Sequence, residues 1–228
     1  MILYHGSQQI IEQPVKSAGK PYNDYGQGFY CTENIELAKE WACPVKRNGY
    51  ANQYELHTDG LRIMRLTESD TEPTNAHILR WLAVLLQNRV FDVSTPLAKQ
   101  AKSYIIENFS PNLKDADVVI GYRADDSYFS FAEDFVSNAI SLRDLKQAMH
   151  LGKLGDQVVL LSDKAFAHIK YQGYEIADYR TYYFKREERD KSARADYRNM
   201  KKTLESLKDD LFVLDIIREG LTDEDARL

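Results

Sequence analysis

Two early stretches decide the fold, "LYHGS" at Leu3–Ser7 and "DYGQGFYCTENIELAKEWA" at Asp24–Ala42. The first is a short apolar strand that ends in a His-Gly pair. The second is a Gly-x-Gly turn that leads into a strand and then a helix, and Trp41 follows Tyr30 after eleven residues. Aromatic side chains on a strand and on the next helix can face each other across a slot that takes a planar ring. Each of them can equally pack in an ordinary core.

Composition limits the class of protein. The chain has 228 residues, 43% of them hydrophobic, which suits one domain with or without an appendage. The formal net charge of −5 is unlike the basic surface of a protein that binds duplex nucleic acid. It does not exclude a nucleic-acid substrate that is touched at a few points.

Cysteine usage and hydropathy predict a cytoplasmic protein. Cys31 and Cys43 are the only cysteines and form no Cys-x-x-Cys motif, which favours reduced thiols over disulfides or a zinc site. The N-terminal segment lacks the pattern of a signal peptide. The longest apolar cluster, residues 81–86, is too short to cross a bilayer.

Short apolar runs predict strands, and the two richest in β-branched residues should be central in their sheet. The strands are expected at residues 2–4, 28–31, 53–57, 61–66, 117–122 and 157–161, the last two being the central ones. The aromatic stretch "YEIADYRTYYF" after Gly173 favours one or two more strands.

Capping residues predict where helices begin. The expected first residues are Thr32, for a helix to about Cys43; Thr74 or Asn75, to Arg89; Thr95 with Pro96; Ser141 with Asp144 at capping-box spacing; and Ser162, to about Tyr171. A helical block at residues 74–152 thus separates early strands from late ones. Because strict strand–helix alternation is missing, the fold class is α+β.

The composition changes near Lys185, where a highly charged, helix-favouring segment begins. We therefore expect a main domain at residues 1–185 and a C-terminal helical extension at residues 186–228. Apolar residues from Tyr197 to Leu214 step by three and four, which is a narrow helical seam. This seam predicts a helix that docks either on a partner or on its own domain.

His5 and Gly6 are the first candidates for chemistry. A glycine at a strand end lets a ligand approach the main chain closely and leaves a backbone N–H and C=O to pair with an amide. Taken alone, the pair is more often a strand-end histidine beside a turn glycine. The Gly26-x-Gly28 turn is no dinucleotide fingerprint, because no strand precedes it.

Together, "YHGS", "YGQGFYCT" and a helix with an aromatic eleven residues after the tyrosine resemble the core of ADP-ribosyltransferases of the poly(ADP-ribose) polymerase and diphtheria-toxin type. The chain is also similar to an uncharacterised bacterial family of that superfamily, including the stretch "GYRADDSYF". The resemblance implies a split β-sheet core with a helical insertion and a C-terminal helical extension. It further implies NAD as co-substrate. No metal is expected, because the remaining histidines, His57, His77, His150 and His168, show no spacing typical of metal ligands.

The resemblance also implies roles for single residues. His5 would bind a ribose hydroxyl of NAD, and the main chain of Gly6 would pair with the nicotinamide carboxamide. Tyr30 and Trp41 would sandwich the nicotinamide ring. The implied cofactor-binding set is His5, Gly6, Ser7, Gly28, Tyr30, Trp41 and Arg123, and the implied catalytic set is His5, Tyr30 and Gln157.

This chain departs from the family at two positions. Gln157 stands where the family has a glutamate that opens a late strand, so the site lacks a charge beneath the ribose. Ala38 stands where the polymerases often have a serine. Asp125 or Asp126, which follow Arg123, could supply a substitute acid or orient an acceptor; helix capping by Asp126 and a surface ion pair explain them equally well. Asp156 should face the opposite side of its strand from Gln157.

Three functions remain open on these grounds. The first is a mono-ADP-ribosyltransferase of the bacterial toxin or effector kind, which moves ADP-ribose from NAD to a macromolecular acceptor and releases nicotinamide. Its acceptor is a protein or a nucleic acid, with protein favoured, and a small inhibitory partner or a second copy could bind the seam. The second is an inactive module that binds NAD or ADP-ribose. The third is an NAD glycohydrolase.

Overall fold

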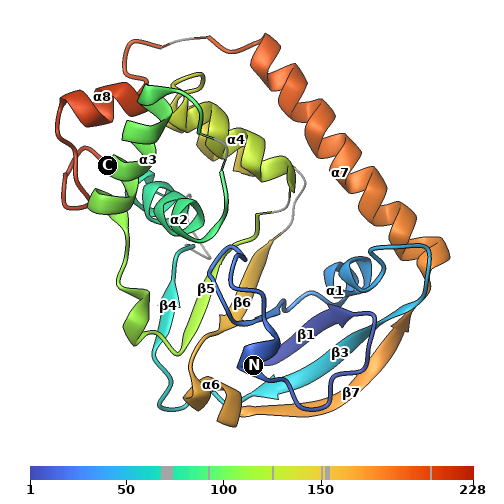
Figure 1. Cartoon of the computed structure of the whole chain (residues 1–228). Helices are drawn as coiled ribbons and strands as arrows, with labels where there is room; N and C mark the ends of the chain where they lie inside the picture. Colours follow the sequence, from blue (N-terminus) through green and yellow to red (C-terminus); the bar gives the residue numbers. More distant parts are fainter. Residues whose placement is uncertain (68–73, 92, 125, 150, 152–154, 206) are drawn as a thin grey trace.

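The computed structural model describes all residues except 68–73, 92, 125, 150, 152–154 and 206, and of residues 126–129 it describes the backbone alone (Figure 1). The strands are β1 (Ile2–Ser7), β2 (Phe29–Cys31), β3 (Gly49–Leu56), β4 (Ile63–Arg65), β5 (Val118–Tyr122), β6 (Asp156–Leu160) and β7 (Ile169–Ala177). The α-helices are α1 (Ile35–Ala42), α2 (Asn75–Asn88), α3 (Pro96–Phe109), α4 (Asp126–Val136), α5 (Leu142–Met149), α6 (Asp163–Ala167), α7 (Tyr179–Lys202) and α8 (Val213–Arg218). The α+β class predicted from the sequence is confirmed.

The strands form two sheets. One has the order β1-β3-β7 and is antiparallel throughout. The other has the order β2-β6-β5-β4, in which β4 and β5 alone run parallel. The strands β5 and β6 are internal to this second sheet, so the prediction that they are central is confirmed.

Among the described residues, one backbone bridge links the edges of the two sheets. The backbone of Tyr4 in β1 exchanges two hydrogen bonds with Thr32, which follows β2, at N–O distances of 2.8 and 2.9 Å. Beyond this bridge, the edge strands β1 and β2 are not joined by a continuous backbone ladder. We call this place, where the two edge strands separate, the split between the sheets. Helix α1 covers β1 beside this split (Figure 1).

Alternation along β5 and β6 divides the core into two clusters. Val119 and Val159 face the helical block of α2 to α5, where Trp81 and Phe131 are fully buried. Their strand neighbours face the other way and pack with Leu3, Phe29, Cys31 and Tyr54 between the sheets. Tyr30 packs on the helical side, whereas Cys31 lies on the other, as strand alternation predicts.

Most helix starts follow from the local sequence. Thr74, Thr95 and Ser162 each accept a hydrogen bond from the backbone N–H three residues later, as predicted. Ser141 and Asp144 form the predicted capping box. The predicted cap at Thr32 is wrong.

Asn34 caps α1 instead, through its side-chain Oδ1, and Thr32 accepts the backbone N–H of Asn34. The strand β2 and its bridge to Tyr4 extend to Thr32, so the helix begins later. Helix α6 also ends early, at Ala167, because β7 begins at Ile169 and pairs with β3.

The C-terminal region differs from the sequence prediction in two ways. The stretch from Tyr174 to Phe184 is a strand only to Ala177, and from Tyr179 it belongs to α7, so the expected domain boundary at 185 falls inside this helix. The predicted seam is not one helix, because α7 ends at Lys202 and α8 begins at Val213.

The seam residues nevertheless dock on their own domain. Tyr197 is buried against Phe131 at a ring-centroid distance of 4.1 Å, and its hydroxyl donates to Asp134 at 2.6 Å. Met200, Leu204 and Leu211 pack on the same core, whereas Leu207 is 53% exposed. Among the helices that the structure describes, none is long and apolar enough to cross a membrane.

Candidate functional site

His5 lies near the end of β1, where β1 and β2 separate. Its ring stacks on Phe29 with centroids 4.5 Å apart, and Nδ1 lies 2.7 Å from the backbone carbonyl oxygen of Tyr30. Because a carbonyl oxygen only accepts, Nδ1 carries the hydrogen and Nε2 is left as an acceptor. Burial, together with the nearby charge of Arg123, lowers the pKa of His5 from its ordinary value. The imidazole is therefore neutral at pH 7, with its acceptor nitrogen available.

Gly6 follows His5 and lies against helix α1. A Cβ at this position would collide with the carbonyl oxygen of Ala38 and lie 2.8 Å from the backbone nitrogen of Ala42. Close packing of strand and helix therefore explains the glycine, independently of any ligand. Ala38 itself has no accessible surface.

The backbone of Gly6 faces the split between the sheets. Alternate residues of an antiparallel strand direct their N–H and C=O groups to opposite edges. Tyr4 uses the edge toward Thr32, so Gly6, two residues later, faces that same edge. Among the described residues no cross-sheet backbone bond extends to Gly6, which leaves these groups directed at the split.

Tyr30 anchors the glycine-rich turn that precedes it. Its hydroxyl donates to the carbonyl oxygen of Gly26 at 2.6 Å and accepts the backbone N–H of Tyr25 at 3.0 Å. Burial raises the pKa of Tyr30, so it is a neutral phenol. Gly28 has no space for a side chain, because a Cβ would lie 2.7 Å from the carbonyl oxygen of Leu160 in β6.

Trp41 and Arg123 meet beside this turn. Trp41 is near the end of α1, and the guanidinium of Arg123, which follows β5, lies over its ring. Burial raises the pKa values of Tyr30 and Asp24, and the positive charge of Arg123 opposes that rise, whereas at His5 the same charge adds to the lowering of the pKa that burial causes. A cation thus occupies a face of the aromatic ring that the resemblance assigns to nicotinamide.

Gln157 is the second residue of β6 and is 1% exposed. Its Nε2 donates to the carboxylate Oδ2 of Asp24 at 2.8 Å and to the carbonyl oxygen of Tyr122 at 3.2 Å. Both partners are acceptors, so the orientation of the amide is fixed with nitrogen toward Asp24. In the part of the chain that the structure describes, Oε1 of Gln157 accepts no hydrogen bond.

Asp24 is a functional candidate that the sequence reasoning missed. It is 6% exposed, accepts the backbone N–H of Ala124 at 3.1 Å, and lies 3.6 Å from Nε of Arg89 at the end of α2. Burial raises its pKa, although the bond from Gln157 and the charge of Arg89 oppose that shift. In the sequence, Asp24 could have been noticed as an acid directly before the Tyr-Gly-Gln-Gly turn. No neighbouring residue, however, indicates that its side chain is buried.

The other predicted residues have plainer surroundings. The Ser7 hydroxyl oxygen accepts the backbone N–H of Gln9 at the surface. Asp156 accepts a hydrogen bond from Thr67 at 2.9 Å. Asp125 lies outside the described residues, and Asp126 begins α4 with a side chain that is not described. Their predicted role as substitute acids therefore stays a prediction.

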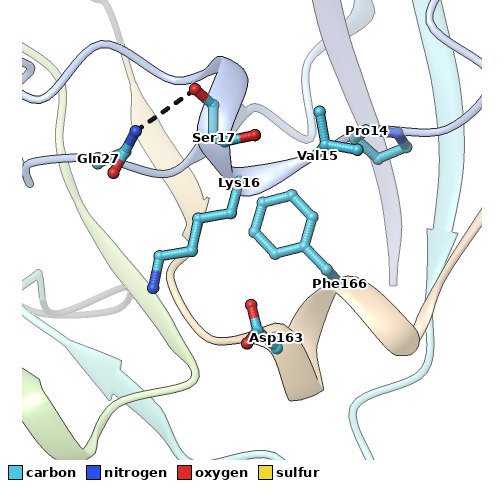
Figure 2. Close-up of a pocket in the computed structure, with 7 residues that line it drawn as sticks. All are labelled: Pro14, Val15, Lys16, Ser17, Gln27, Asp163 and Phe166. Atoms are coloured by element: carbon cyan, nitrogen blue, oxygen red, sulfur yellow. Dashed lines mark hydrogen bonds between the residues drawn. The ribbon is translucent and has the colours of Figure 1, made fainter.

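A pocket of about 490 Å³ adjoins this region (Figure 2). Residues from the loop after β1 form one wall, and helix α6 forms another; the lining residues are Pro14, Val15, Lys16, Ser17, Gln27, Asp163 and Phe166. The ring of Phe166 contacts Phe29 at a centroid distance of 6.3 Å, and Phe29 in turn stacks on His5. Phe29 therefore contacts both His5 and a residue that lines the pocket.

Comparison with known proteins identifies one family. No curated protein and no solved structure matches the chain. A family model described as "Protein of unknown function (DUF3990)" matches residues 1–171. This range contains β1 to β6, with His5, Asp24, Tyr30 and Gln157, and excludes most of β7 and the C-terminal helices. The chain belongs to the DUF3990 family.

Proposed function

We propose that this protein is an NAD-dependent mono-ADP-ribosyltransferase of the bacterial toxin or effector kind. One observation carries the proposal. His5 and Tyr30 come from β1 and β2, the strands that flank the split between the sheets, and Gln157 comes from β6, which pairs with β2. His5 bonds to the backbone of Tyr30, and Tyr30 pairs with Val159, two residues from Gln157 on the same face of β6.

The fold is consistent with this assignment. The resemblance in the motifs implies a split β-sheet core, and in the described part of this chain the edges of the two sheets share one backbone bridge, between Tyr4 and Thr32. This arrangement supports the proposal that the core has the ADP-ribosyltransferase fold, in which α2 to α5 would be the helical insertion and α7 and α8 the extension.

The site offers groups for both halves of NAD. The backbone of Gly6 would pair with the carboxamide, and Nε2 of His5 would accept a ribose hydroxyl. Nicotinamide would stack on Tyr30 and Trp41 after Arg123 leaves the Trp41 ring and turns to the diphosphate. The adjoining pocket would take the adenosine half, with the adenine on Phe166 and a ribose hydroxyl on Asp163 (Figure 2).

The reaction that we propose needs few protein groups. The bond between the ribose C1′ and the nicotinamide nitrogen breaks, and its electron pair neutralises the pyridinium as nicotinamide leaves. The ribose becomes oxocarbenium-like, as in glycoside cleavage. A nucleophile of the acceptor then bonds to C1′ and loses its proton to solvent or to a base. The protein orients NAD and stabilises the developing positive charge through acceptors such as Oε1 of Gln157.

A second function is favoured by two observations. Gln157 carries no charge, and Arg123 already lies on Trp41. Both fit a module that binds NAD or ADP-ribose without turnover. Water as the acceptor would make the protein an NAD glycohydrolase, which is the third alternative.

One experiment separates these functions. The purified protein is incubated with labelled NAD and a cell lysate, and label is measured on protein, on nucleic acid and in free ADP-ribose, beside direct binding by calorimetry. We expect label on protein. Label in free ADP-ribose alone would indicate hydrolysis, binding alone would indicate the inactive module, and no binding at millimolar NAD would exclude all three.

A matched pair of histidine variants tests whether any signal comes from this site. His5→Ala should abolish labelling, while His57→Ala, which changes an exposed histidine after β3, should leave it unchanged. Thermal unfolding of both variants checks that His5→Ala is still folded.

A further inference from the structure

The buried pair Asp24–Gln157 suggests where the missing negative charge of the site lies. We propose that Asp24 is a positioning residue for Gln157. Its carboxylate orients the Gln157 amide and, by polarising that amide, supplies the negative charge that Gln157 lacks. The inference rests on the proposed ADP-ribosyl transfer and adds a residue to it. Nothing in the family description or in the motif resemblance assigns a role to Asp24.

Geometry supports the orienting role. Nε2 of Gln157 lies between two acceptors, Asp24 Oδ2 at 2.8 Å and the Tyr122 carbonyl oxygen at 3.2 Å. An amide held in this way cannot rotate to exchange its ends without placing oxygen against oxygen. Oε1 is therefore held away from Asp24, as an acceptor that has no protein partner among the described residues. A ribose hydroxyl is the kind of donor that it can receive.

Charge supports the second part of the inference. An amide that donates to a carboxylate is polarised, so its oxygen becomes a stronger acceptor than that of a free amide. The effect is largest where water is excluded, and Asp24 is 6% exposed. The bonds from Gln157 and the Ala124 N–H, and the nearby Arg89, help to keep the carboxylate ionised in this position.

The same arrangement explains why glutamine occurs at position 157. A glutamate there would place a second carboxylate against Asp24 and against the Tyr122 carbonyl oxygen. Two buried like charges so close cannot both ionise readily. The pair Asp24–Gln157 thus carries one negative charge in total.

A purely structural role for Asp24 is the competing explanation. Its backbone carbonyl oxygen accepts a bond from Asn88, so the loop is held partly without its carboxylate. Asp24→Asn separates the two explanations. The asparagine oxygen can still accept from Gln157 and from Ala124, so the variant keeps the shape and loses the charge.

The test compares the wild type with Asp24→Asn, Gln157→Glu, the double variant and Asp156→Asn. Steady-state release of nicotinamide from NAD gives kcat and KM, and calorimetry gives NAD binding. Asp156→Asn is the matched control, because Asp156 precedes Gln157 on β6 and bonds to Thr67 instead. Thermal unfolding checks that each variant is folded.

We expect Asp24→Asn to lower kcat by about 10- to 100-fold, the value of a hydrogen bond to a charged group, with KM nearly unchanged. Gln157→Glu alone should also lose activity. The double variant, which exchanges the carboxylate and the amide, should be more active than either single variant. Asp156→Asn should behave as the wild type.

Three results would overturn the inference. The first is a kcat for Asp24→Asn equal to that of the wild type, and the second is a Gln157→Glu variant more active than the wild type. The third is a wild type that binds NAD but releases no nicotinamide, since the assigned charge is then insufficient although NAD binding stands. A wild type that does not bind NAD would overturn the proposed function itself.

Discussion

The imidazole Nδ1 of His5 lies 2.7 Å from the carbonyl oxygen of Tyr30, and this bond joins the two sheets at the candidate site. It fixes the tautomer, so Nε2 is the acceptor nitrogen of the neutral ring. Burial and the charge of Arg123 lower the pKa of His5 from the ordinary 6.5.

The lowered pKa predicts how NAD binding depends on pH. Nε2 accepts only while the ring is neutral, that is, above the pKa of His5. Because that pKa is lowered, the midpoint of the loss of NAD affinity on acidification should lie below pH 6.5. Calorimetric titration with NAD between pH 5 and 8 measures this. A loss of affinity centred on pH 6.5 would contradict a buried, neutral His5.

The Tyr30 hydroxyl predicts a second effect, on the glycine-rich turn. Tyr30→Phe removes one bond to Gly26 and one from Tyr25 but keeps the ring. We expect the free energy of unfolding to fall by about 1–3 kcal/mol, the cost of two such bonds. Hydrogen exchange at Tyr25 should accelerate, and NAD affinity should fall less than in Tyr30→Ala.

Tyr174→Phe is the control for this prediction. Tyr174 is 46% exposed on β7, so its hydroxyl should contribute little to stability. Equal exchange rates at Tyr25 in the wild type and in Tyr30→Phe would show that the phenol does not hold the turn.

Gly6 predicts a packing defect. In Gly6→Ala the new methyl group collides with the Ala38 carbonyl oxygen, so α1 must move away from β1. Overpacking of this kind costs about 1–3 kcal/mol, which urea denaturation resolves. Ser7→Ala, one residue further along the same strand, should change the unfolding free energy by much less. If Gly6→Ala is as stable as the wild type but fails to bind NAD, the glycine serves the ligand rather than the helix.

The attachment of α7 gives a fourth prediction. Arg189 donates two hydrogen bonds to the carboxylate of Glu40 at 2.8 and 2.7 Å, and Glu40 is fully buried. Arg189→Met leaves that carboxylate buried, with Nζ of Lys185 at 3.9 Å from its Oε1. We expect a loss of about 3–5 kcal/mol in urea denaturation.

A matched pair of variants checks this interpretation. Arg194→Met breaks a pair between Arg194 and Asp190 that is exposed on the same helix, and it should cost at most about 0.5 kcal/mol. A double variant with Glu40→Leu and Arg189→Met should recover stability, because no charge is then left buried. If Arg189→Met and Arg194→Met lower the free energy of unfolding equally, the buried Arg189–Glu40 pair contributes no more to stability than the exposed pair.

The sequence predicted best what depends on neighbouring residues. The caps at Thr74, Thr95 and Ser162 were correct because each satisfies a backbone N–H within three residues. The inner position of β5 and β6 was correct because β-branched runs suit strands covered on both faces. Strand alternation also placed Tyr30 and Cys31 on opposite sides.

Predictions failed where distant segments compete for the same residues. Thr32 does not cap α1 because its backbone is paired with Tyr4, a contact from elsewhere in the chain. The seam from Tyr197 to Leu214 has helical spacing, yet the helix ends at Lys202. The chain then turns, and α8 packs on α3. The spacing of apolar residues within the segment cannot indicate such a contact, because it depends on a distant helix.

The sequence by itself determined the strand and helix types, most caps, and the residues His5, Tyr30 and Gln157 as candidates. Only the tertiary structure decided that Gly6 is pressed against α1, that Arg123 lies on Trp41, and that Asp24 holds the amide of Gln157. The physical reason is burial. In the sequence alone, an acid such as Asp24 is expected in an exposed surface loop. The fold buries its carboxylate, and Gln157, Ala124 and Arg89 then take the place of water around it.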